Sequence, residues 1–186
     1  MKKNIIPYIA IFGAFSIIMS SIRVSFPLGN PNLGSTPISI SAIFLNSYGV
    51  FMVGVIKGIG VSIWTGQALL ELPAGIGDGI MGLFTHFLCK RIRISYAIIL
   101  GQISRYIFTS GMIALTLGLL LSLSPNIVMP LVGKVIPNNL QTNLFSNILA
   151  IWFAMIPAIT TSIIVNSILS VIIGFAIEKF YKNVNV

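Results

Sequence analysis

Long apolar runs alternate with short polar or proline- and glycine-rich segments along the whole chain. A helix needs about 20 apolar residues to cross the roughly 30 Å hydrocarbon core of a bilayer. The runs therefore predict an all-α integral membrane protein, a compact bundle of six transmembrane helices in a single domain over residues 1–186. The predicted spans cover residues 5–24, 38–47, 50–69, 74–92, 94–123 and 157–181. Residues 144–155 are expected to form a helix at or entering the outer surface.

The apolar block from Ile38 to Leu70 decides how many spans are counted. As one helix it would measure about 48 Å, well over the hydrocarbon thickness. The stretch Asn46-Ser-Tyr-Gly inside it is a plausible turn, so we divide the block into two spans. Three prolines and two glycines argue against a regular helix over residues 25–37. Residues 124–143, again with three prolines, are expected to form a long loop.

Basic residues lie in short clusters between the apolar runs, and they orient the bundle. With both termini in the cytoplasm, seven cations lie inside and two outside, in keeping with the positive-inside rule. The inner cations are Lys2, Lys3, Lys90, Arg91, Arg93, Lys179 and Lys182, and the outer ones are Arg23 and Lys134. Lys2 and Lys3 precede an apolar run as in a signal peptide. The length of that run and the lack of a convincing cleavage site favour a retained helix.

Composition narrows the class of protein. Of 186 residues, 56% are hydrophobic and 8% are charged, against roughly 25% charged residues in soluble domains. These values exclude a soluble enzyme and a disordered chain, and they indicate the lipid bilayer as the surroundings. The net charge of +8 forms no long basic stripe, so no nucleic-acid partner is expected.

Ionisable side chains inside a membrane are costly and usually face an interior or a cavity. Asp78 lies in the fourth span among glycines, and Glu71 lies just before that span in a short outer loop. Arg105 lies near the middle of the fifth span, with Thr109 on the same helical face. Asn166 reaches a similar depth in the sixth span. These residues predict a polar pocket open to the outside. Alternatively, Arg105 and Asp78 pair with each other or with backbone carbonyls and only brace the bundle.

Four other side chains give weaker indications. Trp152 lies near a helix end, where it either anchors at the membrane surface or stacks on a flat ligand. Lys57 is expected to snorkel to the inner surface or to lie at a partner interface. His86 has no second His or Cys placed to share a metal, so a packed or interface role is expected. Cys89 is the single cysteine, which excludes an intrachain disulfide; no metal site and no cofactor are predicted.

Small residues four positions apart let helix backbones approach closely. Such pairs occur at Ala10 and Ala14, at Gly54 and Gly58, and at Gly75 and Gly79. Each pair forms either an internal packing face or a docking face for a partner membrane subunit.

Motifs of energised or catalytic chemistry are missing from the sequence. It contains no Walker A stretch, dinucleotide fingerprint, HExxH or GxSxG. One histidine, one cysteine and three acidic residues leave few catalytic combinations, so no enzyme is expected. A self-sufficient small oligomeric permease or channel is one interpretation. It would use Gly54 and Gly58 for self-association, and Arg105 with Asp78 as a pore constriction.

The chain also resembles the substrate-binding S component of energy-coupling factor (ECF) vitamin transporters. The resemblance covers nearly the whole chain and rests on its size, on six spans and on several local sequences. These are the loop at 29–37, the paired spans joined at 46–49, Ala10-Ile-Phe-Gly-Ala14, Arg105-Tyr-Ile-Phe-Thr-Ser-Gly111, and 157–179 with Asn166.

The resemblance implies a subunit of the plasma membrane that captures a water-soluble vitamin or related micronutrient from outside. Its expected partners are a transmembrane coupling subunit, matched by Ala10 and Ala14, and two cytoplasmic ATPases. Arg105 and Asn166 match positions of the binding helices. Lys2 stands where cobalt- and nickel-specific members carry a histidine, so a metal substrate is rejected.

The charge of the ligand stays open in the sequence. Asp78 and Glu71 would suit a cationic group on the ligand, whereas Arg105 would suit a carboxylate or phosphate. The candidate substrate-binding residues are Glu71, Asp78, Arg105, Thr109, Trp152 and Asn166, and the candidate partner-interface residues are Ala10, Ala14, Gly54 and Gly58.

Overall fold

The computed structural model describes residues 4–133 and 143–184, and these residues fold almost entirely into helices. In chain order the helices are α1 Ile6–Met19, α2 Ser35–Phe44, α3 Ser47–Thr65, α4 Ala68–Cys89, α5 Ile94–Ile103, the 3-10 helix η1 Ser104–Tyr106, α6 Phe108–Leu123, α7 Pro125–Val132, α8 Leu144–Ala154 and α9 Ile156–Val184. The all-α prediction is confirmed for the part of the chain described. The positive-inside prediction also used Lys2, Lys3 and Lys134, which lie outside the described residues.

Within residues 4–133 and 143–184, four helical segments are long and apolar enough to cross a membrane. They are α3, α4, the continuous run Ile94–Leu123 through α5, η1 and α6, and the part Ile156–Phe180 of α9. Large apolar side chains are exposed on these segments and on α1: Ile63, Ile172 and Ile18 leave 78%, 62% and 64% of their surface exposed. Such exposed aliphatic side chains suit a lipid-facing surface, because hydrocarbon does not penalise them as water does.

The first two predicted spans form helices that are shorter than predicted. Helix α1 has 14 residues and ends at Met19 rather than at residue 24. Beyond it the chain turns back, and the Val24 amide donates to the Pro31 carbonyl over 2.9 Å. Helix α2 has 10 residues, which at 1.5 Å per residue gives about 15 Å. Neither helix alone is long enough to cross the hydrocarbon core.

Two predicted boundaries were wrong because each helix begins before a proline and not after it. Helix α2 begins at Ser35, with Pro37 in its first turn, where an amide proton has no partner within the helix. Helix α4 begins at Ala68 rather than at residue 74, and it continues through Pro73. Glu71 therefore lies in the first turns of α4 and not in a loop. The predicted loop 124–143 contains helix α7, which has Pro125 at its first position.

The predicted turn between the second and third spans is confirmed. Leu45 and Asn46 are extended, and the Asn46 side chain accepts a hydrogen bond of 2.8 Å from the Gly49 amide. This is an N-cap, which satisfies one of the amide protons left free at the start of α3. At the other end of α3, Gly66 takes a φ of +70°, the left-handed conformation that glycine adopts without strain.

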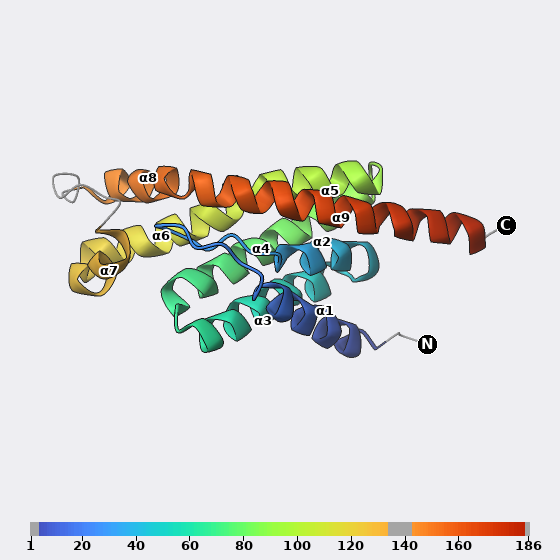
Figure 1. Cartoon of the computed structure of the whole chain (residues 1–186), viewed down its shortest axis with the longest axis horizontal. Helices are drawn as coiled ribbons and strands as arrows, with labels where there is room; N and C mark the ends of the chain where they lie inside the picture. Colours follow the sequence, from blue (N-terminus) through green and yellow to red (C-terminus); the bar gives the residue numbers. More distant parts are fainter. Residues whose placement is uncertain (1–3, 134–142, 185–186) are drawn as a thin grey trace.

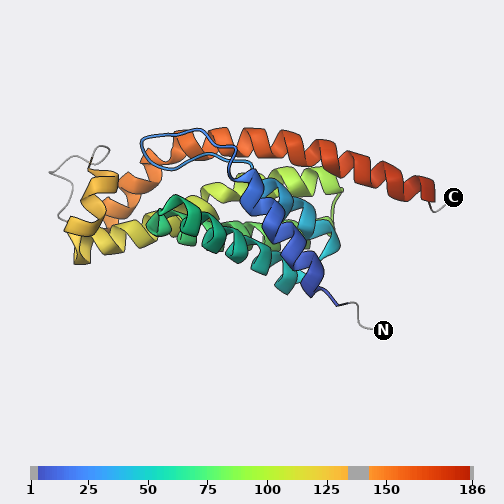
Figure 2. The same ribbon diagram turned by 60° about the horizontal axis from the view of Figure 1, so that its bottom comes forward.

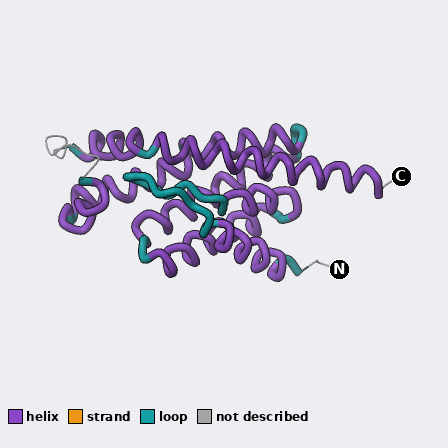
Figure 3. Tube along the Cα trace, viewed as in Figure 1, coloured by secondary structure: helices purple, strands orange, loops and turns teal. Residues whose placement is uncertain are grey.

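Most of the helices lie roughly along the long axis of the molecule (Figure 1). Helices α3 and α4 run in opposite directions, whereas α6 continues the direction of α5 and α9 that of α8. Both termini lie toward one end, whereas α7 and α8 lie at the other (Figures 1 and 2). The loop between α1 and α2 extends along the bundle toward the α7 end and returns (Figure 3). It therefore passes over the helices that carry most of the charged residues predicted to form a pocket.

Helices α3 and α4 pack more closely than side chains would permit. A Cβ atom on Gly58 would lie 2.8 Å from the Gly75 Cα atom, and one on Gly54 would lie 2.8 Å from the Gly75 carbonyl oxygen. The same Cβ on Gly54 would lie 2.5 Å from the Gly79 Cα atom. The four glycines thus form one backbone-to-backbone contact, which fixes how α3 and α4 are rotated against each other.

Candidate functional site

The carboxylate of Asp78 is the centre of a buried polar cluster. It is fully buried in α4 and pairs with two cations, the Lys57 ammonium from α3 and the Arg105 guanidinium from η1. Arg105 Nε donates to Asp78 Oδ1 over 3.0 Å, and Thr109 Oγ1 donates to the same oxygen over 2.7 Å. A buried carboxylate is tolerated only when it is paired and hydrogen-bonded, and this one is both.

Local structure brings these groups together. The chain tightens into a 3-10 turn at η1 between two α-helices, and this turn carries Arg105. Gly77 of α4 lies against the backbone of α6, where a Cβ would come within 2.6 Å of the Phe108 carbonyl oxygen. This close contact brings Thr109 to Asp78. On the opposite side, the glycine contact between α3 and α4 brings Lys57 to Asp78.

The cluster continues from Arg105 to the loop between α1 and α2. Arg105 Nη1 donates to Ser162 Oγ of α9 over 2.8 Å. The carbonyl of Asn32, in the loop, accepts from Asn166 Nδ2 over 2.7 Å. Asn166 Oδ1 in turn accepts from Thr36 Oγ1 over 2.8 Å. Asn166 is fully buried, so this single side chain fixes the loop and the start of α2 to α9.

A second contact fixes the loop to α4. Asn30 Nδ2 donates to Gln67 Oε1, which precedes α4, over 2.8 Å. Residues 29–32 are thereby held between the start of α4 and α9, over the charged cluster. Arg23, at the base of the loop, lies 4.6 Å from the centre of the Trp64 ring.

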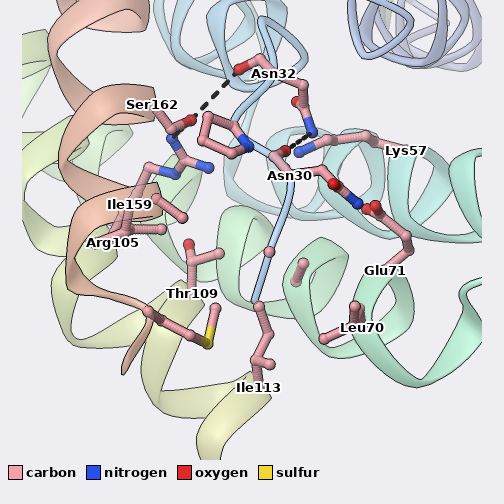
Figure 4. Close-up of a pocket in the computed structure, with 15 residues that line it drawn as sticks. Asn30, Asn32, Lys57, Leu70, Glu71, Arg105, Thr109, Ile113, Ile159 and Ser162 are labelled. Carbon is pink, nitrogen blue, oxygen red and sulfur yellow. Dashed lines mark hydrogen bonds between the residues drawn. The ribbon is translucent and has the colours of Figure 1, made fainter. Parts of the chain in front are cut away.

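Beneath residues 29–32 lies a small cavity of about 50 Å³. Its polar lining comes from Lys57, Glu71, Arg105, Thr109 and Ser162, together with the two loop asparagines (Figure 4). An engineered cavity of about 150 Å³ is large enough for benzene. The cavity beneath residues 29–32 is therefore smaller than an organic ligand of that size needs.

The structure brings most of the predicted site residues together. Glu71, Arg105 and Thr109 line the cavity, and Asp78 lies directly behind them. Asn166 holds the loop instead of lining the cavity. Arg105 and Asp78 also form an ion pair with each other, and this part of the alternative prediction is confirmed.

Trp152 lies outside the cavity. Its Nε1 donates to the Tyr106 carbonyl oxygen over 2.7 Å, so the ring connects α8 to η1. This hydrogen bond fixes the ring, and Trp152 does not contribute to the lining that the other site residues form.

The expectation for Lys57 was wrong. Only 2% of its surface is exposed, and its ammonium reaches Asp78 instead of the membrane surface. A signal was present in the sequence. Lys57 lies three residues after Gly54 and one before Gly58. It therefore lies on the side of α3 where small residues allow a neighbouring helix to approach closely. Asn30, Asn32 and Ser162 were missed as well, since loop residues and a serine in a long helix have no periodic signature.

The small-residue pairs fall into two groups. Gly54 and Gly58 are buried inside the α3–α4 contact, which agrees with the internal-packing alternative. Ala10 and Ala14 lie exposed on α1. His86 is packed as expected, with Nδ1 2.9 Å from the Ala42 carbonyl oxygen.

Replacing Asn166 with alanine should loosen the loop. The change removes the donor to the Asn32 carbonyl, and one hydrogen bond contributes about 1 kcal/mol or more in a buried setting. We expect amide hydrogen exchange at Val24, whose amide donates to Pro31, to accelerate by about tenfold. Asn147→Ala is the control, since that buried amide has no hydrogen-bond partner. Equal exchange at Val24 in both variants would show that Asn166 does not hold the loop.

Comparison of the chain with protein-family models, with curated proteins and with solved structures found no match.

Proposed function

We propose that the chain is the substrate-binding S component of an ECF-type importer, located in the plasma membrane. In this role it captures a water-soluble vitamin or related micronutrient from outside. A transmembrane coupling subunit and two cytoplasmic ATPases then drive its release inside. The observation that carries the proposal is the cavity between α4, α6 and α9. It is lined by charged groups and covered by a loop that the side chains of Gln67 and Asn166 bind at Asn30 and Asn32.

The geometry suits binding and release better than catalysis or conduction. The charged groups contact one another and the covering loop, and they leave a small space that would grow on displacement of residues 29–32. A ligand would then replace the loop as the partner of the lining groups. Because release to the cytoplasm needs energy and the sequence carries no nucleotide-binding motif, the proposal assigns that step to other subunits.

The proposed topology has six passes, with both termini in the cytoplasm. Its support is that the termini lie at one end of the molecule. In addition, α3, α4, the run of α5 and α6, and the run of α8 and α9 follow one another in alternate directions (Figure 1). Helices α1 and α2 would complete their passes with the irregular residues beside them, of which Leu28, Pro31 and Gly34 are buried by neighbouring helices. Residues 21–25 are exposed and would lie at the membrane surface. Irregular backbone at membrane depth is tolerated only where protein or a cavity surrounds it. Labelling of single cysteines from either side, in a Cys89→Ser background, tests the topology: residues near Arg91 should react from the cytoplasmic side only.

The function is tested by mass spectrometry of small molecules released on denaturing the detergent-purified protein. A stoichiometric micronutrient is the expected result, and it would name the substrate. If the protein carries nothing and instead moves solutes into liposomes without ATP, the self-sufficient permease replaces this proposal. The permease interpretation needs Gly54 and Gly58 for self-association, but α4 already packs against both glycines.

The exposed pair on α1 gives a test of the partner. Ala10→Leu together with Ala14→Leu should prevent co-purification of the coupling subunit while leaving ligand binding unchanged. The physical reason is that leucine side chains hold two helices apart where alanine lets them touch. Ala176→Leu, at an exposed alanine of α9, is the matched control. Undiminished co-purification of the double variant would exclude this face as the interface.

A further inference from the structure

We infer that the ligand presents a positively charged nitrogen to Glu71, so that the micronutrient captured is an organic cation. The inference rests on the proposed function and names the chemical class of its substrate. It decides between the two ligand charges that the sequence leaves open, because the structure shows which charged groups are already paired.

Glu71 is a buried carboxylate that lacks a direct partner. It lines the cavity from the first turns of α4 and is 6% exposed. Its side chain points toward Asn30 and Lys57 (Figure 4). Yet Asn30 donates to Gln67 and Lys57 pairs with Asp78. Within the described residues, Glu71 takes part in neither of the two buried ion pairs and accepts no side-chain hydrogen bond.

The other charged groups of the cavity are paired with each other. Four ionisable side chains are buried here, two basic and two acidic: Lys57, Arg105, Asp78 and Glu71. Both cations contact Asp78, and Arg105 also donates to Ser162. A buried ion without a partner costs several kcal/mol of free energy, so Glu71 is the group that gains most from a ligand.

An anionic ligand fits the same cavity poorly. To bind Arg105 or Lys57 directly it would compete with Asp78, which is fully buried and therefore cannot turn to solvent. It would also approach the unpaired charge of Glu71, which repels it. A cationic nitrogen, by contrast, meets Glu71 without disturbing the ion pairs around Asp78. Charge-assisted hydrogen bonds of this kind are about twice as strong as neutral ones.

Glu71→Gln separates binding from folding. The amide keeps the shape of the side chain and removes its charge, so it should raise the thermal unfolding temperature of the ligand-free protein or leave it unchanged. The same variant should bind a cationic ligand at least about tenfold more weakly. If Glu71 had only a structural role, the variant would instead unfold at a lower temperature than wild type. Glu178→Gln is the charge-matched control, since Glu178 lies near the end of α9 and does not line the cavity.

The experiment compares small molecules released from wild type, Glu71→Gln and Glu178→Gln. A stoichiometric organic cation in wild type and Glu178→Gln, absent or strongly reduced in Glu71→Gln, supports the inference. An anionic or neutral compound in all three overturns it and leaves the proposed function standing. If Glu71→Gln retains the cation to the same extent as wild type, Glu71 does not bind the ligand.

Should wild type carry no compound, calorimetric titration uses thiamine as the cationic probe, biotin as the anionic one and riboflavin as the neutral one. Binding of thiamine that Glu71→Gln weakens and Glu178→Gln does not supports the inference. Binding of biotin or riboflavin without thiamine overturns it. A wild-type protein that binds none of the three contradicts the proposed function itself, and the inference with it.

Discussion

Asp78→Asn should lower the free energy of unfolding by about 3–5 kcal/mol, the usual cost of removing one member of a buried ion pair. The substitution keeps the size of the side chain but leaves Lys57 and Arg105 buried without their counter-ion. The measurement is thermal or denaturant unfolding of the purified protein in detergent. Loss of ligand binding should follow, because Arg105 and Thr109 take their positions from the same carboxylate.

A double variant tests whether Lys57 and Asp78 stabilise each other. Lys57→Met combined with Asp78→Asn removes one cation and one anion, so it should be less destabilised than Asp78→Asn alone. Residues in direct contact show such coupling, whereas independent residues give additive effects. Additive losses in the double variant would mean that Lys57 and Asp78 do not stabilise each other. A fully stable Asp78→Asn protein would contradict the buried cluster altogether.

Gly58→Ala should destabilise the protein by about 1–3 kcal/mol through overpacking. The new methyl group would lie 2.8 Å from the Gly75 Cα atom and 2.9 Å from the Glu71 carbonyl oxygen, and backbone cannot move aside as a side chain can. Separating α3 from α4 also moves Lys57 away from Asp78, so ligand binding should fall together with stability.

The matched control is Gly111→Ala in α6, where an added Cβ meets nothing within 4 Å. There alanine should stabilise the helix by up to about 1 kcal/mol, since glycine is the poorer helix former. Unfolding in detergent compares the two variants directly. If Gly58→Ala keeps its stability and instead disrupts an oligomer, the glycines serve self-association, and the permease interpretation gains support.

The sequence by itself determined the all-helical class, the presence of helices long and apolar enough to cross a membrane, and the turn at Asn46. Each follows from local chemistry. Long apolar runs can satisfy their backbone in a bilayer only as helices, and an N-cap residue acts within its own turn. The interior position of Asp78 and Arg105 was predictable for the same reason, because a charge in a membrane helix is costly wherever the neighbouring helices lie.

Only the tertiary structure decided which partners these groups have. Lys57 and Asp78 are 21 residues apart, and Asn166 and Asn32 are 134 apart. Whether such groups meet depends on the rotation and depth of one helix against another, and periodicity within a helix carries no information on either. The glycine contact between α3 and α4 sets that geometry for Lys57, and the return of the loop over α9 sets it for Asn32. The same contacts leave Glu71 as the unpaired charge, which could not be read from residue types alone.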